Sequence, residues 1–281
     1  MILNALPSHV PAAIRARAGV AEGRRLMVGC SGADVFRLES PSQGDCYLKT
    51  MFSPRGRDEL SLRGERDRLL WLGERLAASA PPGEADADLR SPRVLAFSEG
   101  DGDAGQWTYL LTSAVPGTPL HEAVVDGPIR VGRLMGRALR VLHELDPSGC
   151  PDWRSPDRLL AEAAENVRLG RIRASEMRAG NDAAKLLREL QKRPPKVFEP
   201  VVCHGDFCLP NVLATLDDRC GLVDLGGVCV SDRHLDLAAA VRSLRFNGGL
   251  DDVVKVFQNW YGREEIDPIR MYWYTRLWDL L

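Results

Sequence analysis

The sequence lacks the features that are typical of nucleic-acid-binding, membrane-spanning and secreted proteins. Its formal net charge is only −2 at pH 7, so no strong basic field indicates a nucleic-acid partner. It has no run of about 18 apolar residues, the length that a membrane-spanning helix needs. The N-terminal stretch has no charged region ahead of an apolar core, so we expect neither a membrane span nor a signal peptide.

The cysteines also lack the spacing of a metal site or a redox motif. Seven are present, an odd number, and no two form a Cys-x-x-Cys pair. Scattered cysteines of this kind are typical of buried thiols in a reducing compartment, so we expect a cytoplasmic protein. The 281 residues, of which 44% are hydrophobic and 27% charged, are typical of a soluble globular chain with one large domain or two lobes.

Strand patterns dominate the first third of the chain. Apolar segments on either side of Gly29 and Gly32 predict a hairpin over residues 24–40. The other expected strands are short and apolar: residues 45–52, 93–100 and 106–115. One helix is expected between them, over residues 57–78, because apolar residues recur there at helical spacing among charged ones.

The pattern changes from strand to helix after Pro116. Amphipathic helices are expected over residues 131–145, 156–172 and 182–193. Two short strands are expected around residues 197–206 and 219–225, and three further helices near Asp232, Asp251 and Asp267. We therefore predict an α+β, bilobal fold, with an antiparallel-sheet lobe over residues 1–113 and a mainly helical lobe over residues 114–281. The cleft between such lobes is a natural ligand site.

The stretch VVCHGDFCLPNVL, residues 201–213, carries the strongest chemical signal. Asp206 follows an apolar strand in a glycine-containing turn, where a carboxylate can orient a substrate hydroxyl or accept its proton. Asn211 comes five residues later, and Asp224 ends the next apolar run thirteen residues beyond it. An amide oxygen and a carboxylate that face each other are suitable Mg²⁺ ligands. Together the three residues predict a phosphoryl-transfer site, with Asp206 on the nucleophile and Asn211 and Asp224 on the metals.

Each of these residues alone has a simpler interpretation. An Asp in a turn is usually a local cap, Asn211 could be an ordinary loop residue, and Asp224 could merely end a strand. His204, in the same turn, could be a structural histidine. Only the joint spacing, in a strand–loop–strand context, favours the phosphoryl-transfer site.

Residues 201–213 together with GLVDLGGVCVSDRHLDLA, residues 221–238, resemble the core of the aminoglycoside O-phosphotransferases, most closely the 3'- and 3''-type. That family has a protein-kinase-like fold and transfers the terminal phosphate of a nucleoside triphosphate to a drug hydroxyl. The resemblance implies that Asp206 is the catalytic base and that Asn211 and Asp224 are magnesium ligands. It also implies that His204 supports the loop and that Asp236 braces it from a helix. Without the resemblance, Asp236 could equally be an exposed helix residue.

A cation near the phosphates is expected on the strand CYLKT. Lys49 lies there between apolar neighbours, although a solvated lysine on a strand edge would look the same. The resemblance pairs Lys49 with Glu65 on the following helix, which would hold Lys49 on the alpha and beta phosphates. It also implies that Ser31, in a loop with only two glycines, contacts a phosphate. The backbone of Ser113 and Val115 would then bind the edge of the adenine.

Aminoglycosides are polycations, so their sites need clustered carboxylates. The chain end YWYTRLWDLL resembles that of the family, which makes Asp279 and the Leu281 carboxylate candidate acceptor contacts. A frayed amphipathic end is the simpler alternative. Two features depart from the family: Gly227 stands where an Arg is usual, and residues 168–196 hold nine Lys or Arg against three acids. The basic segment indicates either a solvated helix face or a less cationic acceptor.

The sequence therefore predicts a small-molecule kinase that uses ATP or GTP with Mg²⁺ to phosphorylate an aminoglycoside hydroxyl, and so confers antibiotic resistance. Two rivals stay open: a kinase of another hydroxylated antibiotic or metabolite, and a catalytically weak nucleotide-binding member of the fold. A protein kinase is disfavoured because no activation loop ending in Ala-Pro-Glu follows Asp224. We expect a monomer or a weak dimer.

Overall fold

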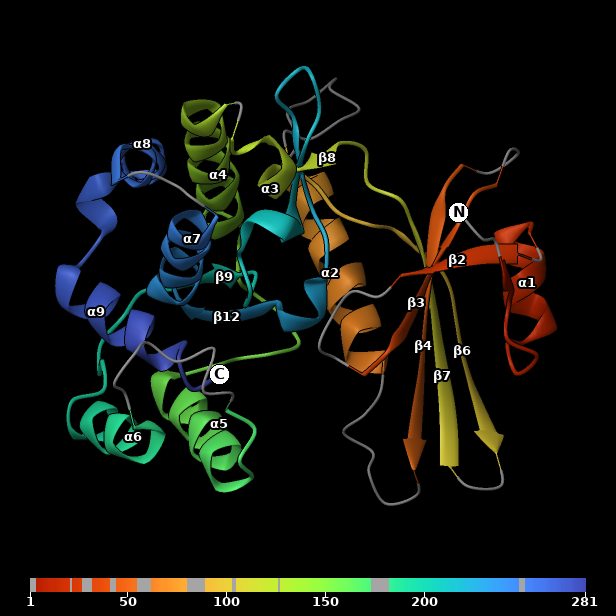
Figure 1. Cartoon of the computed structure of the whole chain (residues 1–281), viewed down its shortest axis with the longest axis horizontal. Helices are drawn as coiled ribbons and strands as arrows, with labels where there is room; N and C mark the ends of the chain where they lie inside the picture. The colour runs from red at the N-terminus through yellow and green to blue at the C-terminus, as the bar shows by residue number, and fades with distance from the viewer. Residues whose placement is uncertain are drawn as a thin grey trace. The chain divides into compact units, whose positions relative to one another are not determined.

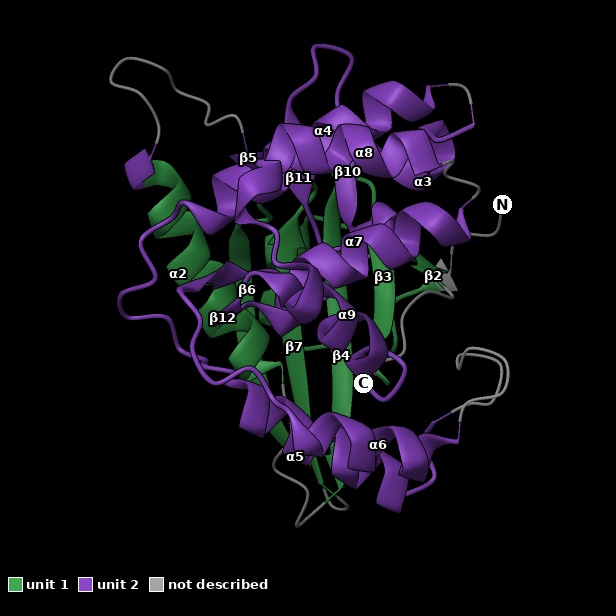
Figure 2. Ribbon diagram, turned by 90° about the vertical axis from the view of Figure 1, so that its left-hand side faces the viewer, with its two compact units in different colours: residues 1–77, 91–115 green, residues 78–90, 116–281 purple. Residues whose placement is uncertain are grey.

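The computed structural model describes residues 4–20, 22–26, 32–40, 44–54, 62–79, 89–102, 105–125, 127–172, 182–247 and 251–281 (Figure 1). Gly29 and Ser31, in the expected phosphate loop, lie outside these ranges. The chain divides into two compact units, Met1–Ala77 with Ser91–Val115 and Ala78–Arg90 with Pro116–Leu281 (Figure 2). The boundary expected after residue 113 lies two residues before this division. None of the helices in the described ranges combines the length and the apolar character needed to cross a membrane.

The first unit is built on a six-stranded antiparallel sheet in the order β1-β2-β3-β4-β7-β6. Its strands are β1 Asn4–Ala5, β2 Glu22–Leu26, β3 Asp34–Leu38, β4 Cys46–Pro54, β6 Val94–Gly102 and β7 Gly105–Ser113. The expected hairpin is the antiparallel pair β2–β3, and the other three expected strands are β4, β6 and β7. β4 lies between β3 and β7, so its residues belong to the interior of the sheet.

Two helices complete the first unit. α2, Arg63–Ser79, is the expected helix, and it buries Leu69, Leu72 and Leu76. α1, Ala12–Ala18, was not predicted. It buries only Ile14 and Ala18, so its apolar spacing is too short to stand out in the sequence.

The second unit is mainly helical, as predicted. Its helices are α3 Leu120–Ala123, α4 Pro128–His143, α5 Pro156–Arg168, α6 Ala183–Lys192, α7 His234–Phe246, α8 Asp251–Tyr261 and α9 Pro268–Leu277. Side chains cap the first turns of three of them: Ser155 of α5, Asp182 of α6 and Asp267 of α9 each accept a backbone N–H. α4 packs closely on α8 because Gly136 has no side chain; a Cβ there would lie 2.5 Å from Phe257 O.

Small sheets hold the segments that carry Asp206, Asn211 and Asp224. The paired strands are β9 Pro200–Cys203 with β12 Cys229–Asp232, and β10 Val212–Ala214 with β11 Cys220–Leu222, flanked by β8 Thr118–Pro119 and β5 Leu89–Arg90. Two 3₁₀ turns lie between them, η1 Leu209–Asn211 and η2 Leu225–Gly227. β9 and β11 were expected, whereas β10 and β12 were not. Both missed strands are buried on every residue, so they show no alternation of apolar and polar positions.

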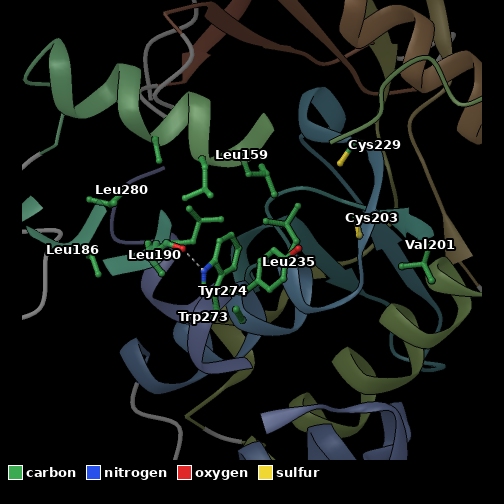
Figure 3. Packing of buried hydrophobic residues seen from close by; sticks show 14 residues of the cluster. Leu159, Leu186, Leu190, Val201, Cys203, Cys229, Leu235, Trp273, Tyr274 and Leu280 are labelled. Carbon is green, nitrogen blue, oxygen red and sulfur yellow. Dashed lines mark hydrogen bonds between the residues drawn. The ribbon is translucent and has the colours of Figure 1, made fainter. Parts of the chain in front are cut away.

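An apolar cluster fixes β9 in the interior of the second unit (Figure 3). Cys203 at the end of β9 belongs to the same cluster as Leu159 of α5, Leu190 of α6 and Tyr274 of α9. Burying one of these leucine side chains completely stabilises the fold by about 1.5–3 kcal/mol. Trp273 adds a bond across the cluster, donating its indole N–H to Leu190 O at 3.1 Å. The turn that follows Cys203 therefore starts from a rigid point.

Candidate active site

The turn after β9 is held by one carboxylate from α7. Asp236 is fully buried and accepts the backbone N–H of His204 at 2.6 Å and that of Gly205 at 2.9 Å. Bonds to an ionised acceptor are the stronger hydrogen bonds of proteins. The carboxylate thus lies beneath the turn and not on an exposed face of the helix, which is the alternative that the sequence alone allowed.

His204 links this turn to the segment that ends at Asp224. Its Nε2 lies 3.0 Å from Val223 O, and its Nδ1 lies 3.3 Å from the backbone N of Asp206. These partners fit the neutral tautomer that donates from Nε2 and accepts at Nδ1. Because the ring is fully buried, it holds the backbone on both sides and is not available to a substrate.

Gly205 is required by the shape of the turn. Its φ of +82° lies in the left-handed region, and a Cβ would lie 2.1 Å from Gly227 O. The turn therefore packs directly on η2, which begins after Asp224. Asp224 itself has a φ of +57°, an uncommon conformation that is often found at functional sites.

Asn211 and Asp206 are in direct contact. Asn211 is 9% exposed, and its Nδ2 donates to Asp206 O at 3.0 Å and to Asp206 Oδ2 at 3.2 Å. The nitrogen side of the amide thus faces Asp206. In the same segment Val223 N–H donates to Asn211 O at 3.0 Å, which brings the residue before Asp224 alongside Asn211. The three predicted residues therefore lie close together.

The pKa of Asp206 depends on the groups that are packed around it. Its pKa is raised, chiefly because the surrounding protein removes water from the carboxylate, although the residue remains exposed at the surface; nearby Asp224 adds to the shift. Burial also raises the pKa of the adjacent Cys208 thiol to about 12, so this thiol is neutral at physiological pH. The Asp224 carboxylate and the Asn211 amide oxygen offer oxygen donors only, and a divalent cation would relieve the repulsion between Asp206 and Asp224, so these residues fit Mg²⁺.

In the first unit, Lys49 and Glu65 form a half-buried ion pair. Lys49 Nζ lies 2.7 Å from Glu65 Oε1, with side chains that are 19% and 13% exposed. Lys49 is on β4, an interior strand, so the alternative of a lysine on a strand edge does not apply. Glu65 lies in the first turn of α2, and the pair therefore fixes the ammonium group relative to both the sheet and the helix.

We expect Glu65→Gln to raise the KM for nucleotide by about 10-fold, because a half-buried ion pair that loses one charge leaves Lys49 poorly oriented. The matched control is Glu99→Gln, which breaks another link between α2 and the sheet, the exposed pair Arg63–Glu99. An exposed pair contributes little, so this variant should keep the wild-type KM. Initial rates over a range of nucleotide concentrations compare the two. Equal KM values for both variants would contradict the role expected for Glu65.

The expected adenine-binding backbone lies at the end of β7. Ser113 N–H already donates to Arg93 O at 2.9 Å, and Ser113 Oγ accepts Arg93 N–H at 3.0 Å. A base contact at Ser113 would therefore have to use its carbonyl group. Val115, two residues further on, is largely buried.

The C-terminal segment is ordered by polar contacts. Arg242 of α7 donates to Asp279 Oδ1 at 2.9 Å and to Trp278 O at 3.0 Å. Asn166 of α5 donates to Leu280 O at 3.1 Å and to Leu281 O at 3.3 Å. The chain end is therefore not the frayed helix that was the alternative. Since the Asp279 side chain is 1% exposed, it lies inside the protein, on Arg242.

The described part of the basic segment 168–196 carries its charges outward. On α6 the basic side chains of Lys185, Arg188 and Lys192 are exposed, whereas Leu186 and Leu190 enter the apolar cluster. Residues 173–181, which include two of the arginines, lie outside the described residues. For α6, the solvated helix face is the interpretation that agrees with the structure.

The sequence-based reasoning missed Ser243. Its hydroxyl accepts Leu209 N–H at 2.9 Å, which holds the start of η1 and so the turn that carries Asn211. Asp236 and Ser243 are seven residues apart on α7, a spacing that places both on one face of a helix. This spacing was the available signal, because two polar residues on an otherwise apolar helix face need buried partners.

The chain is similar over most of its length to known phosphotransferases. Residues 25–274 match the Phosphotransferase enzyme family. Over 265 residues, covering 89% of this chain and 91% of the relative, it is 33% identical to an aminoglycoside 3'-phosphotransferase of Streptomyces fradiae. Over 228 residues, covering 77% and 75%, it is 34% identical to a streptomycin 3''-kinase of Streptomyces griseus.

Solved structures agree with these relatives. An aminoglycoside 3'-phosphotransferase of type VIII matches with a TM-score of 0.74 and 30% identity, covering 96% of this chain and 97% of that one. The aminoglycoside phosphotransferase APH(3'')-Id of Streptomyces rimosus, in complex with ADP and streptomycin, matches with a TM-score of 0.73 and 28% identity, covering 95% of each chain.

Proposed function

Since the chain belongs to the phosphotransferase enzyme family and has its bilobal α+β, protein-kinase-like fold, we propose that it transfers the terminal phosphate of a nucleoside triphosphate to a hydroxyl of an aminoglycoside. The observation that carries the proposal is the contact of Asn211 with Asp206, beside the segment that ends at Asp224. Phosphorylation of the drug would confer antibiotic resistance in the cytoplasm. The protein would act as a monomer or a weak dimer.

Asp206 acts as the catalytic base in this proposal. The Asn211 amide holds one of its carboxylate oxygens, and the backbone of its turn is fixed by His204 and Asp236. The carboxylate orients the acceptor hydroxyl for in-line attack on the terminal phosphorus and takes its proton as the new oxygen–phosphorus bond forms. The bond from that phosphorus to the bridging oxygen breaks, and the nucleoside diphosphate leaves. A raised pKa suits this task, because it makes the ionised carboxylate a stronger base.

Asn211 and Asp224 would hold Mg²⁺ through one amide oxygen and one carboxylate. When bound, the cation neutralises charge on the phosphates. Lys49, held by Glu65, would bind the alpha and beta phosphates of ATP or GTP, with Ser31 on a phosphate. The Ser113 carbonyl and the Val115 N–H would bind the base.

For the acceptor, we propose two different roles at the chain end. The Leu281 carboxylate would bind an amino group of the drug directly. Asp279, buried against Arg242, would instead fix the position of that terminus. The outward-facing charges of α6 remove one objection to a cationic acceptor, because solvated lysines are screened by salt.

Mass spectrometry after incubation with ATP or GTP, Mg²⁺ and a panel of aminoglycosides tests the proposal. We expect a mass gain of one phosphate on at least one 3'- or 3''-hydroxyl drug. Turnover of no aminoglycoside, with turnover of another hydroxylated antibiotic or metabolite, would replace the proposed acceptor. Binding of nucleotide without turnover of any alcohol would favour the catalytically weak alternative, for which Gly227 in place of the usual Arg is the warning sign.

A further inference from the structure

Asp236, the carboxylate beneath the turn of Asp206, is itself held by a buried imidazole. His143, the last residue of α4, is buried, and its Nε2 lies 3.3 Å from Asp236 Oδ2. Its Nδ1 lies 2.8 Å from the hydroxyl oxygen of Tyr261, the last residue of α8. The Tyr261 side chain is buried too, and the two rings meet edge to face at 5.5 Å.

The hydrogen bonds of this chain of residues run in one direction. The phenol O–H of Tyr261 donates to His143 Nδ1, which leaves the His143 proton on Nε2, where it donates to Asp236. Asp236 in turn accepts the N–H groups of His204 and Gly205, with its Oδ2 on His204 and its Oδ1 on Gly205. Every donor has one acceptor, so α8, α4 and α7 are connected to the backbone of the catalytic turn.

The charges around Tyr261 leave this arrangement intact. Arg233 approaches the Tyr261 hydroxyl at 3.5 Å, but it is also paired with Glu199 at 2.9 Å and Glu265 at 2.6 Å. Burial lowers the pKa of His143 despite the nearby Asp236, which favours the neutral ring that this tautomer requires.

The same group also has the composition of a metal site. Ligand atoms of His143, Cys203 and Asp236 lie within 4.8 Å of one another. Both nitrogens of His143 and both oxygens of Asp236 are already engaged in hydrogen bonds, however. A cation would have to displace the bonds that hold the turn, and the geometry therefore favours a hydrogen-bonded function.

We propose that His143 and Tyr261 are positioning residues, which fix the Asp236 carboxylate and through it the turn that carries Asp206. Asp236 must keep its two oxygens on two successive N–H groups, and a rotation of the carboxylate would break one of these bonds. The bond from His143 prevents this rotation, and Tyr261 prevents the imidazole from turning over. The inference rests on the proposed role of Asp206 as the catalytic base.

Tyr261→Phe, compared with Tyr274→Phe, tests the inference. Each change removes one phenol oxygen from a fully buried tyrosine of the second unit, but the Tyr274 hydroxyl has no hydrogen-bond partner in the described structure. We expect Tyr261→Phe to lower kcat by about 5-fold with unchanged KM for nucleotide, because one neutral hydrogen bond is lost from the support of the turn. Tyr274→Phe should keep the wild-type kcat. A wild-type kcat in Tyr261→Phe, or equal losses in both variants, would overturn the inference.

Two variants of His143 separate positioning from simple packing. Gln can still donate an amide N–H to Asp236, whereas Leu cannot, so kcat should be higher in His143→Gln than in His143→Leu. Hydrogen exchange gives a second measurement: the amides of His204 and Gly205 should exchange faster in His143→Leu and in Tyr261→Phe, but not in Tyr274→Phe. Unchanged exchange in all variants would reject the inference even if kcat falls. If the wild type itself transfers no phosphate while the exchange pattern is as expected, the proposed function fails and the structural link stands.

Discussion

Asp206→Asn is expected to lower kcat by about 10²- to 10⁴-fold, the range that general-base catalysis contributes. The variant keeps the shape of the side chain and its contact with Asn211, but it loses the charge that orients the acceptor hydroxyl and accepts its proton. Nucleotide affinity should stay close to that of the wild type, because Lys49 and Glu65 are unchanged. Single-turnover kinetics for the chemical step and calorimetry for nucleotide binding measure the two effects separately.

Asp252→Asn is the matched control for this experiment. It removes the charge of an exposed Asp on α8 that pairs with Lys255, three residues further along the helix. Exposed pairs of this kind contribute less than about 1 kcal/mol, so activity should be retained. A kcat for Asp206→Asn within tenfold of the wild type would mean that another group activates the hydroxyl.

Gly205→Ala is expected to lower kcat/KM by about 100-fold, because a displacement of about 1 Å at a reacting group has an effect of this size. The new Cβ would lie 2.1 Å from Gly227 O, well inside the contact distance of two atoms, and the nearest atoms all belong to the backbone of Gly227. Either the turn of Asp206 or the η2 turn after Asp224 must move. The unfolding free energy should also fall by more than the 1–2 kcal/mol that a left-handed conformation costs an Ala.

Gly170→Ala separates the clash from the backbone strain. Gly170 has a φ of +63°, and no atom lies within 4 Å of the position that its Cβ would take. This variant should lose about 1–2 kcal/mol of stability through strain alone and keep its activity. Urea unfolding measures the stability of both variants, and steady-state kinetics measures their activity. If both lose activity equally, the contact between Gly205 and Gly227 is not what shapes the site.

The sequence by itself determined the longer elements of this protein and the members of its proposed catalytic loop. Strand and helix periodicities are local, so β4, β7 and the longer helices could be read from windows of about ten residues. Asp206, Asn211 and Asp224 were also recognisable, because they lie within 19 residues in one strand–loop–strand segment. Short elements such as β10 and α1 were not predicted, because two to seven residues without alternation are too few to show a strand or helix periodicity.

Only the tertiary structure decided which distant groups support that loop. Asp236 could have been an exposed helix residue until its two bonds to the turn were visible. His143 and Tyr261 are 118 residues apart, and Asp279 is placed inside the protein by Arg242 from another helix. A buried polar group needs a partner, but the partner is chosen by the packing of α4, α7, α8 and α9 against one another. No local pattern records that packing, because it depends on all the helices together.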